Sequence, residues 1–281
     1  MIVNLNAILP EARKEKKAVG AFNVYNYETI KGVILAASEL KTPVIVAFGE
    51  RYLQNMSFEE VYSLTKTIAE QHEVKTVLHL DHCKSTNNII NAIKANFSSV
   101  MFDGSLLPFS ENLRKTKEVV EIAHSYGVTV EAELGSIASG TFSSEEGSTE
   151  IYTDPGQAEE FVKETQIDAL AVSIGTVHGM YKGEPKINIE VLREIAKRVE
   201  IPLVLHGGSG TPEEIIKECI RNGISKININ TEVSMNVVAK INELLSRNGI
   251  SLHFSDISKE VTNCVKEVAK KYISMFYFSG I

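Results

Sequence analysis

A regular alternation of two kinds of segment is the feature that most limits how this chain can fold. Short runs rich in β-branched residues, such as "PVIVAFG" at 43–49, alternate with longer segments of helical period. This pattern is typical of βα units that build a parallel sheet. We predict strands at 20–24, 43–49, 75–82, 98–104, 128–135, 168–175, 202–208 and 225–231. Helices are expected at 27–40, 58–72, 86–95, 109–126, 156–165, 188–198, 212–222 and 232–246.

Eight strands that are each followed by a helix predict a (β/α)8 TIM barrel. An open doubly wound sheet has the same periodicity and stays an alternative. Residues 136–154 form a long polar segment between two units, and loops of this length often act as lids. Residues 258–276 predict an extra C-terminal helix. Because no linker or low-complexity tract divides the chain, we expect residues 1–281 to form a single domain.

Composition narrows the functional classes. The 281 residues carry a net charge of −7 with acids and bases mixed, whereas nucleic-acid binding needs a basic patch, so no nucleic-acid partner is expected. No apolar run approaches the roughly 20 residues that span a bilayer. In residues 1–17 the charges follow the apolar part, which is the reverse of a secretory signal. Because the chain also has no long apolar run, no membrane partner is expected. The 3 cysteines lie far apart, which favours a reducing cytoplasm.

Polar residues gather at the carboxyl ends of the predicted strands, which in a barrel meet at one mouth. They are Asn23, Asp81, His82, Asp103, Glu131, Glu133, His178, His206, Asn228, Asn230 and Thr231. One such histidine is usually structural, but three of them beside several carboxylates predict a metal site, because a catalytic zinc has three protein ligands and an open position. The remaining histidines are assigned to the surface or to structure: His72, His124 and His253.

The alternation of side chains along a strand limits which residues of "LHLDHC" at 78–83 can reach the same metal. His79 and Asp81 share one face by parity, and we expect His79 to pack inside the barrel. His82 has the opposite parity. It can reach a metal beside Asp81 only if the strand has already given way to a loop.

A glycine-rich turn predicts an anion site after the seventh strand. In "LHGGSGTPEE" at 205–214, glycines let backbone N–H groups converge, although a simple tight turn would also explain them. Thr211, Pro212 and Glu214 fit the N-cap, N1 and N3 positions of the next helix. Lys182, four residues after His178, could reach a phosphate or lie in solvent.

Six motifs in this order resemble the class II, metal-dependent ketose-bisphosphate aldolases. They are "LHLDH", "SSVMFDGS", "VEAELG", "GTVHGMYKGEP", "PLVLHGGSG" and "KININTE". The resemblance spans nearly the whole chain and implies reversible aldol cleavage of a fructose- or tagatose-type 1,6-bisphosphate to dihydroxyacetone phosphate and an aldehyde such as glyceraldehyde 3-phosphate. It implies a homodimer or homotetramer, and a phosphorylated sugar as the partner molecule.

The resemblance also implies roles for individual residues. Zinc would be held by His82, His178 and His206, with Asp103 and Glu133 nearby, Glu133 being favoured over Glu131. Asp81 would be the base that takes the substrate's hydroxyl proton, and Glu145 or Glu146 on the long loop a second acid/base. Substrate contacts would come from Asn23, Gly179, Lys182, Gly207, Gly208, Ser209, Asn228, Ile229, Asn230 and Thr231. A monovalent cation, Na⁺ or K⁺, often assists there.

The sequence departs from the family pattern at three places in or near the expected site. Cys83 stands where glycine is usual, and we expect it to pack. Gly49 stands where fructose-type enzymes tend to have serine. The segment before the last helix lacks the arginine that binds the distal phosphate in fructose-type relatives, so Arg51, Arg221 or another residue would have to replace it.

Other functions remain open at this level. A Schiff-base aldolase would use Lys226, but it would leave the histidines unexplained. A metal-dependent hydrolase of barrel fold, a relative acting on another phosphorylated ketose or keto acid, and a weakly catalytic sugar-phosphate-binding protein are further alternatives.

Overall fold

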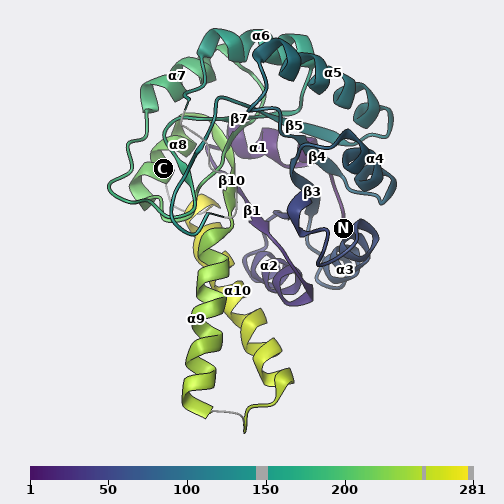
Figure 1. Cartoon of the computed structure of the whole chain (residues 1–281), viewed down its shortest axis with the longest axis vertical. Coiled ribbons are helices and arrows are strands. Elements are labelled where there is room, and N and C mark those ends of the chain that lie inside the picture. The colour runs from purple at the N-terminus through teal and green to yellow at the C-terminus, as the bar shows by residue number, and fades with distance from the viewer. Residues whose placement is uncertain (144–150, 249–250, 278–281) are drawn as a thin grey trace.

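Eight parallel strands close into a barrel in the computed structural model of the chain, which describes residues 1–143, 151–248 and 251–277 (Figure 1). Neighbouring strands pair around the barrel in the order β1, β10, β9, β7, β5, β4, β3, β2, and β2 pairs with β1 to close it. Their bounds are β1 Val19–Asn23, β2 Val44–Gly49, β3 Thr76–Cys83, β4 Ser99–Phe102, β5 Thr129–Leu134, β7 Ala169–Val172, β9 Leu203–Leu205 and β10 Ile224–Ile229. The predicted barrel is confirmed, and the open sheet is wrong.

A helix follows each strand of the barrel, and all of these helices except the last cover its outside (Figure 1). They are α2 Tyr27–Leu40, α3 Phe58–Gln71, α4 Thr86–Lys94, α5 Phe109–Ser125, α6 Pro155–Thr165, α7 Ile189–Arg198, α8 Glu213–Arg221 and α9 Thr231–Asn248. Several begin at side chains that cap free backbone N–H groups. Asn26 with Thr29, and Ser57 with Glu60, form capping boxes at α2 and α3.

The predicted cap of α8 is wrong. Pro212 occupies the N-cap position and no side chain caps the helix. The Thr211 hydroxyl is used elsewhere: Oγ1 donates to the Gly207 carbonyl at 3.2 Å and lies 2.9 Å from the Tyr181 hydroxyl. Thr211 therefore braces the glycine-rich turn and does not start the helix.

The N-terminal segment closes the amino end of the barrel. A short 3-10 turn, Leu5–Ala7, and α1, Leu9–Lys14, place buried apolar side chains against the inward-facing residues of the strands. This cluster is separate from the larger apolar layer between the sheet and the outer helices. The carboxyl end of the barrel is thereby left as the open mouth where chemistry can occur.

Two short strands lie outside the barrel and were not predicted. β6, Ala138–Ser139, pairs in parallel with β8, Val177–His178. The segment after β5 therefore runs beside the loop that carries His178. The Gly140 N–H donates to the His178 carbonyl at 2.7 Å, which ties the two loops together at the mouth.

The extra C-terminal helix is confirmed as α10, Phe254–Tyr277. It packs against α2 and α9, and Figure 1 shows α9 and α10 projecting together from one side of the barrel. We call this helical pair the arm. Among the described residues, no helix combines the length and apolarity that crossing a membrane requires.

Candidate active site at the mouth of the barrel

A bulge at the end of β3 aims His82 into the mouth. The pairing of β3 with β4 shifts between Leu80 and Cys83, and His82 has a left-handed backbone with a φ of 45°. A bulge changes which face a side chain points to. In a regular strand His82 would point away from the face that carries Asp81. A bulge inside the strand, and not the end of the strand, turns the His82 side chain toward that face.

Three histidines meet at this point. Their rings come from β3, from the loop after β7 and from the end of β9, and ring centroids of His82 lie 5.0 Å from His178 and 4.5 Å from His206. One ring nitrogen from each of the three lies within 4.8 Å of the others. The spacing is that of a set of side chains able to hold one cation.

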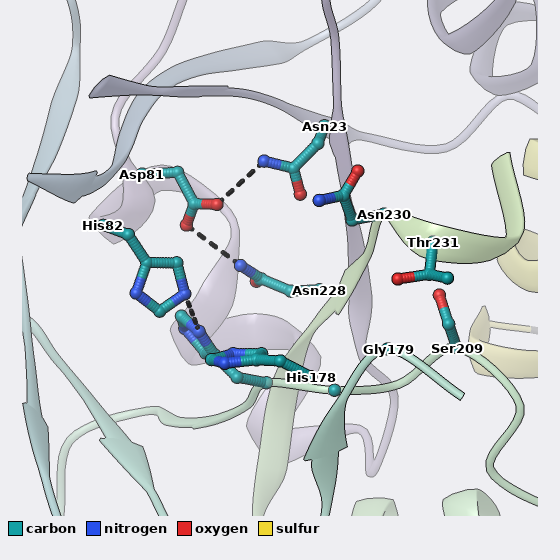
Figure 2. A pocket seen from close by; sticks show the side chains of 11 residues that line it. Asn23, Asp81, His82, His178, Gly179, Ser209, Asn228, Asn230 and Thr231 are labelled. Carbon is teal, nitrogen blue, oxygen red and sulfur yellow. Dashed lines mark hydrogen bonds between the residues drawn. The ribbon is translucent and has the colours of Figure 1, made fainter. Parts of the chain in front are cut away.

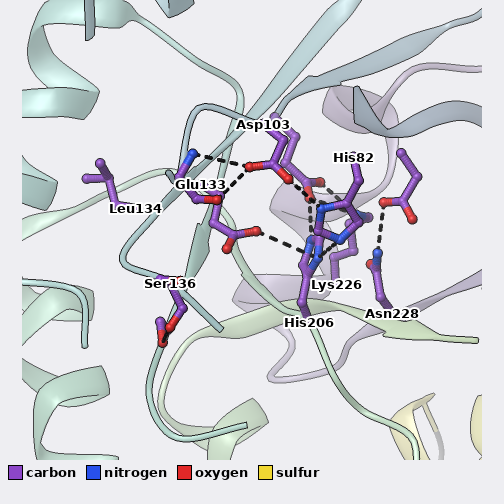
Figure 3. A network of polar contacts seen from close by, with 12 residues as sticks. His82, Asp103, Glu133, Leu134, Ser136, His206, Lys226 and Asn228 are labelled. Atoms are coloured by element: carbon purple, nitrogen blue, oxygen red, sulfur yellow. Dashed lines mark hydrogen bonds and ion pairs between the residues drawn. The ribbon is translucent and has the colours of Figure 1, made fainter. Parts of the chain in front are cut away.

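Hydrogen bonds to carboxylates determine which histidine nitrogens face that cation position. His82 Nδ1 lies 3.0 Å from Asp103 Oδ2, and His206 Nε2 lies 2.9 Å from Glu131 Oε1, so each of these nitrogens carries the proton it donates (Figure 3). The other two nitrogens, His82 Nε2 and His206 Nδ1, then face each other with lone pairs at 2.7 Å. Two lone pairs at this distance repel unless they share a proton or both point at one cation, and a metal ion in front of the pair would meet this need.

His178 completes the donor set. Its Nε2 is buried and has no hydrogen-bond partner, so this nitrogen is available to bind a metal. Burial, followed by repulsion from His82, holds the pKa of His178 well below its usual range. The ring is therefore neutral, which is the form that binds metals.

Asp103 and Glu133 flank His82 in a second group that could contribute a ligand. Burial, followed by repulsion from Asp103, raises the pKa of Glu133 well above its usual range, and its Oε2 has no partner. A cation would favour the ionised carboxylate. Glu131 lies deeper, bonded to His206, so Glu133 is the better placed of the two glutamates to meet a metal.

Asp81 is held by two amides directly beside the histidines. Asn23 Nδ2 donates to Oδ2 at 2.9 Å and Asn228 Nδ2 donates to Oδ1 at 3.0 Å (Figure 2). Burial favours the neutral acid, but the positive potential around His82, His206 and Lys226 outweighs it and lowers the pKa of Asp81 far below its usual range. Asp81 is therefore an oriented, ionised carboxylate, which is the form that accepts a proton.

A buried ion pair lies beneath this site. Lys226 has no exposed surface, and its Nζ lies 2.7 Å from Glu131 Oε2. His79 packs there as expected, with Nδ1 2.8 Å from Ser99 Oγ, and burial followed by Lys226 lowers its pKa to about 3. Lys226 is thus bound inside the barrel and does not line the pocket, which disfavours its use as a Schiff-base nucleophile.

The opposite side of the pocket presents small and polar groups suited to an anion. Ser209 and Thr231 lie together there, and the positive φ of Gly207, 70°, lets the turn approach closely (Figure 2). The first turn of α9 begins at Thr231, so the N-terminal end of this helix, which favours an anion, lies beside the pocket. The Gly208 N–H instead donates to the Asn228 carbonyl at 3.1 Å. Gly208 therefore holds the turn and has no N–H left for a ligand.

Most of the predicted site residues line one pocket. They are Asn23, Asp81, His82, His178, Gly179, His206, Gly207, Ser209, Asn228, Asn230 and Thr231. Ile229 packs its side chain in the apolar core, and Lys182 is exposed and does not line the pocket. Glu145 and Glu146 lie outside the described residues.

Two tyrosines at the mouth were not predicted. The Tyr52 ring covers Gly49, where an added Cβ would come within 3.2 Å of it. Asn230 donates to the Tyr52 hydroxyl at 3.3 Å, and its carbonyl oxygen accepts from the Tyr25 hydroxyl. Tyr52 therefore occupies the space left by Gly49 and orients a pocket amide. The aromatic residue directly after the second strand, in "GERYL", was the available signal.

Cys83 packs, as expected. It is buried in the core, and its Sγ contacts Glu50 Oε1 and the Ser85 carbonyl, both at 3.3 Å. Burial, followed by the charge of Glu50, raises the pKa of the thiol. A thiol in this state is inert.

The mouth of the barrel brings together three histidines that could hold a cation, an ionised aspartate and a glycine-rich turn suited to an anion. Residues 3–280 match the family described as class-II fructose-bisphosphate aldolase. The chain belongs to this family, and it is therefore an aldolase, a carbon–carbon lyase.

Individual relatives agree with this assignment. The chain is 41% identical over 270 residues to the uncharacterized protein YdjI of Escherichia coli K12, covering 96% of this chain and 95% of that protein. It is 44% identical over 249 residues to fructose-bisphosphate aldolase of Geobacillus stearothermophilus, covering 88% and 86%. The crystal structure of the YdjI aldolase superposes with a TM-score of 0.87 at 37% identity, over 100% of this chain and 99% of that one.

Proposed function

We propose that the protein cleaves a ketose 1,6-bisphosphate of the fructose or tagatose type, reversibly, to dihydroxyacetone phosphate and an aldehyde such as glyceraldehyde 3-phosphate. The observation that carries this is Asp81, ionised and oriented by Asn23 and Asn228, beside the histidines and opposite an anion site. Aldol cleavage needs a base on one side of the breaking bond and stabilised charge on the other. Asp81 would supply the base, and a metal held by the histidines would supply the stabilisation of charge.

Asp81 would take the proton of the C4 hydroxyl, after which the C3–C4 bond breaks and its electron pair stays on the dihydroxyacetone phosphate half. His82, His178 and His206 would hold the metal, for which we propose Zn²⁺ because of the all-nitrogen donor set. When bound, the metal supplies Lewis-acid stabilisation of the negative charge that develops on the carbonyl oxygen. Gly207, Ser209 and Thr231 would hold the C1 phosphate, with a monovalent cation, Na⁺ or K⁺, beside it.

The proton that later reaches the carbanion carbon would come from Glu145 or Glu146. Both glutamates lie outside the described residues, and the support comes from the described residues that precede them. The described chain up to residue 143 is tied to the mouth, because Thr141 and Met180 exchange backbone hydrogen bonds of 2.7 and 2.9 Å close to His178.

A second candidate is a ketose phosphate whose aldehyde half carries no phosphate. Among the described residues that line the pocket, none is arginine or lysine. Arg51 follows β2 and lies at the mouth, stacked on Tyr52 at 5.6 Å. Arg221 ends α8 and therefore lies at the other end of the barrel, which leaves Arg51 as the candidate for a distal phosphate.

A substrate panel tests the proposal. The metal-loaded protein is expected to release dihydroxyacetone phosphate from fructose or tagatose 1,6-bisphosphate, detected through reduction by glycerol-3-phosphate dehydrogenase. Ketose 1-phosphates serve as the second set, and their preference would select the second candidate. Chelation should abolish turnover and zinc should restore it, because the histidines cannot supply the charge stabilisation alone. If metal binds and no ketose phosphate is cleaved, the proposal is wrong.

We also propose a homodimer or homotetramer in the cytoplasm. The arm exposes an apolar stripe of Met235, Val238 and Leu245 on α9, with Phe254 at the start of α10. Exposed apolar stripes on a projecting element are typical of subunit contacts. The cysteines are free, which suits a reducing compartment.

Replacing Val238 and Leu245 together with aspartate is expected to lower the molar mass measured by light scattering to that of a smaller species. Asn236→Asp is the matched control, because residues two apart on a helix differ by about 200° and face opposite sides. A wild-type protein that is monomeric at micromolar concentration would contradict the proposed assembly.

A further inference from the structure

The C-terminal helix reaches back to the anion-binding turn through one carboxylate. Glu232 lies in the first turn of α9, next to Thr231 of the pocket. Its backbone N–H donates to Ser209 Oγ at 3.2 Å, and its Oε2 accepts from the Gly210 N–H at 3.3 Å. Glu232 is therefore bonded to the turn at two consecutive residues, one of which lines the pocket.

α10 holds the other side of the same carboxylate. The Tyr272 hydroxyl donates to Glu232 Oε2, and Lys271 Nζ lies 2.9 Å from Oε1. Tyr272 is buried at 2% exposure, whereas the Lys271 side chain is 59% exposed. Burial would raise the pKa of Glu232, but the hydrogen bonds from Tyr272 and Lys271 outweigh it and lower that pKa. The carboxylate is thus ionised, and both of its oxygens are occupied.

The contacts of Glu232 with α10 offset the repulsion between its carboxylate and a bound phosphate. A phosphate is favoured at the N-terminus of a helix, where free N–H groups point outward. A negative carboxylate in the same first turn repels the phosphate. Lys271 offsets this charge, and Tyr272 holds the carboxylate against α10.

We propose that Tyr272 and Lys271 are positioning residues for the phosphate-binding turn, acting through Glu232 to keep Ser209 and the first turn of α9 ready for the substrate's phosphate. The inference rests on the proposed function, because it needs a phosphorylated substrate in this pocket. It assigns to α10, which lies outside the eightfold repeat, a part in substrate affinity.

The test measures affinity and turnover separately on the metal-loaded protein. Tyr272→Phe and Lys271→Gln are each expected to weaken binding of dihydroxyacetone phosphate and of inorganic phosphate, and to raise KM, by roughly tenfold, the size of one hydrogen bond to a charged group. The value of kcat should change less than about twofold, because interactions equal in ground and transition state alter KM alone. Tyr126→Phe, at an exposed tyrosine that ends α5, is the matched control.

A rescue separates positioning from general support of the fold. Adding Glu232→Gln to Lys271→Gln removes the charge that Lys271 offsets, so phosphate affinity should return to within about threefold of wild type. Lys271 is exposed, so its variant is expected to fold whatever happens to Tyr272→Phe. Unchanged affinity in folded Lys271→Gln, or no recovery in the double variant, would overturn the inference. A wild-type protein that cleaves no ketose phosphate and binds no phosphate would overturn the proposed function as well, so the two failures are distinguishable.

Discussion

Asp81→Ala is expected to lower kcat for ketose cleavage by about 10²–10⁴-fold, the contribution of a positioned general base. The wild-type carboxylate is ionised and held at both oxygens by Asn23 and Asn228, so it is ready to take a proton. The lowered pKa means that this readiness persists through neutral and mildly acidic pH, where a carboxylate of raised pKa would be protonated. The variant's kcat follows from coupled detection of dihydroxyacetone phosphate.

The metal content of Asp81→Ala shows whether its lowered kcat comes from the missing base or from a missing metal. Asp81 is not a member of either group of side chains that could hold a metal, so Asp81→Ala should bind metal as wild type does. His178→Ala should lose metal and activity together. Asp256→Ala, at an exposed aspartate in the first turn of α10, is the matched control and should leave kcat unchanged. Full turnover by metal-loaded Asp81→Ala would remove Asp81 from the mechanism.

Periodicity was sufficient to predict the barrel because each βα unit repeats the same local pattern. The helices at 27–40 and 58–72 begin at Asn26 and Ser57, whose side chains accept from the backbone three residues on. α1 was missed because six residues are too few to show a helical period. β6 and β8 have two residues each and exist only because two distant loops meet.

A site residue could be predicted where its type and its place at the end of a strand together indicate its role. The histidines, Asp81 and the glycine turn follow from position alone, since carboxyl ends of barrel strands converge. The bulge at His82 was not predicted, because the parity argument predicted a loop at this point, whereas the strand continues to Cys83 with a shift in its register. Tyr52 and Tyr272 were missed because their partners, Asn230 and Glu232, lie 178 and 40 residues away along the chain.

Lys226→Met is expected to lower the free energy of unfolding by about 3–5 kcal/mol, the cost of leaving one member of a buried ion pair alone. Lys226 and Glu131 have no exposed surface, and their oxygen and nitrogen atoms lie as close as 2.7 Å. Burial would raise the pKa of Glu131, but Lys226 outweighs it and the pKa falls to about 2. Without Lys226 the glutamate gains a proton or stays charged and unpaired, and both states cost stability. Denaturant unfolding of the metal-free protein measures the change.

The same substitution is expected to weaken zinc binding by about 10–100-fold, the usual effect of losing a group that orients a metal ligand. Ionised Glu131 accepts from His206 Nε2 and so leaves Nδ1 free for the metal, whereas a protonated Glu131 can leave the ring in the other tautomer. Competition with a chromogenic chelator measures the affinity. Lys197→Met, with a side chain 69% exposed, is the control for loss of a lysine. In excess zinc, Lys226→Met should still cleave substrate, because the amine takes no bond in the reaction. Complete inactivity in the metal-saturated variant, with borohydride trapping of substrate on wild type, would instead establish Lys226 as an imine-forming nucleophile.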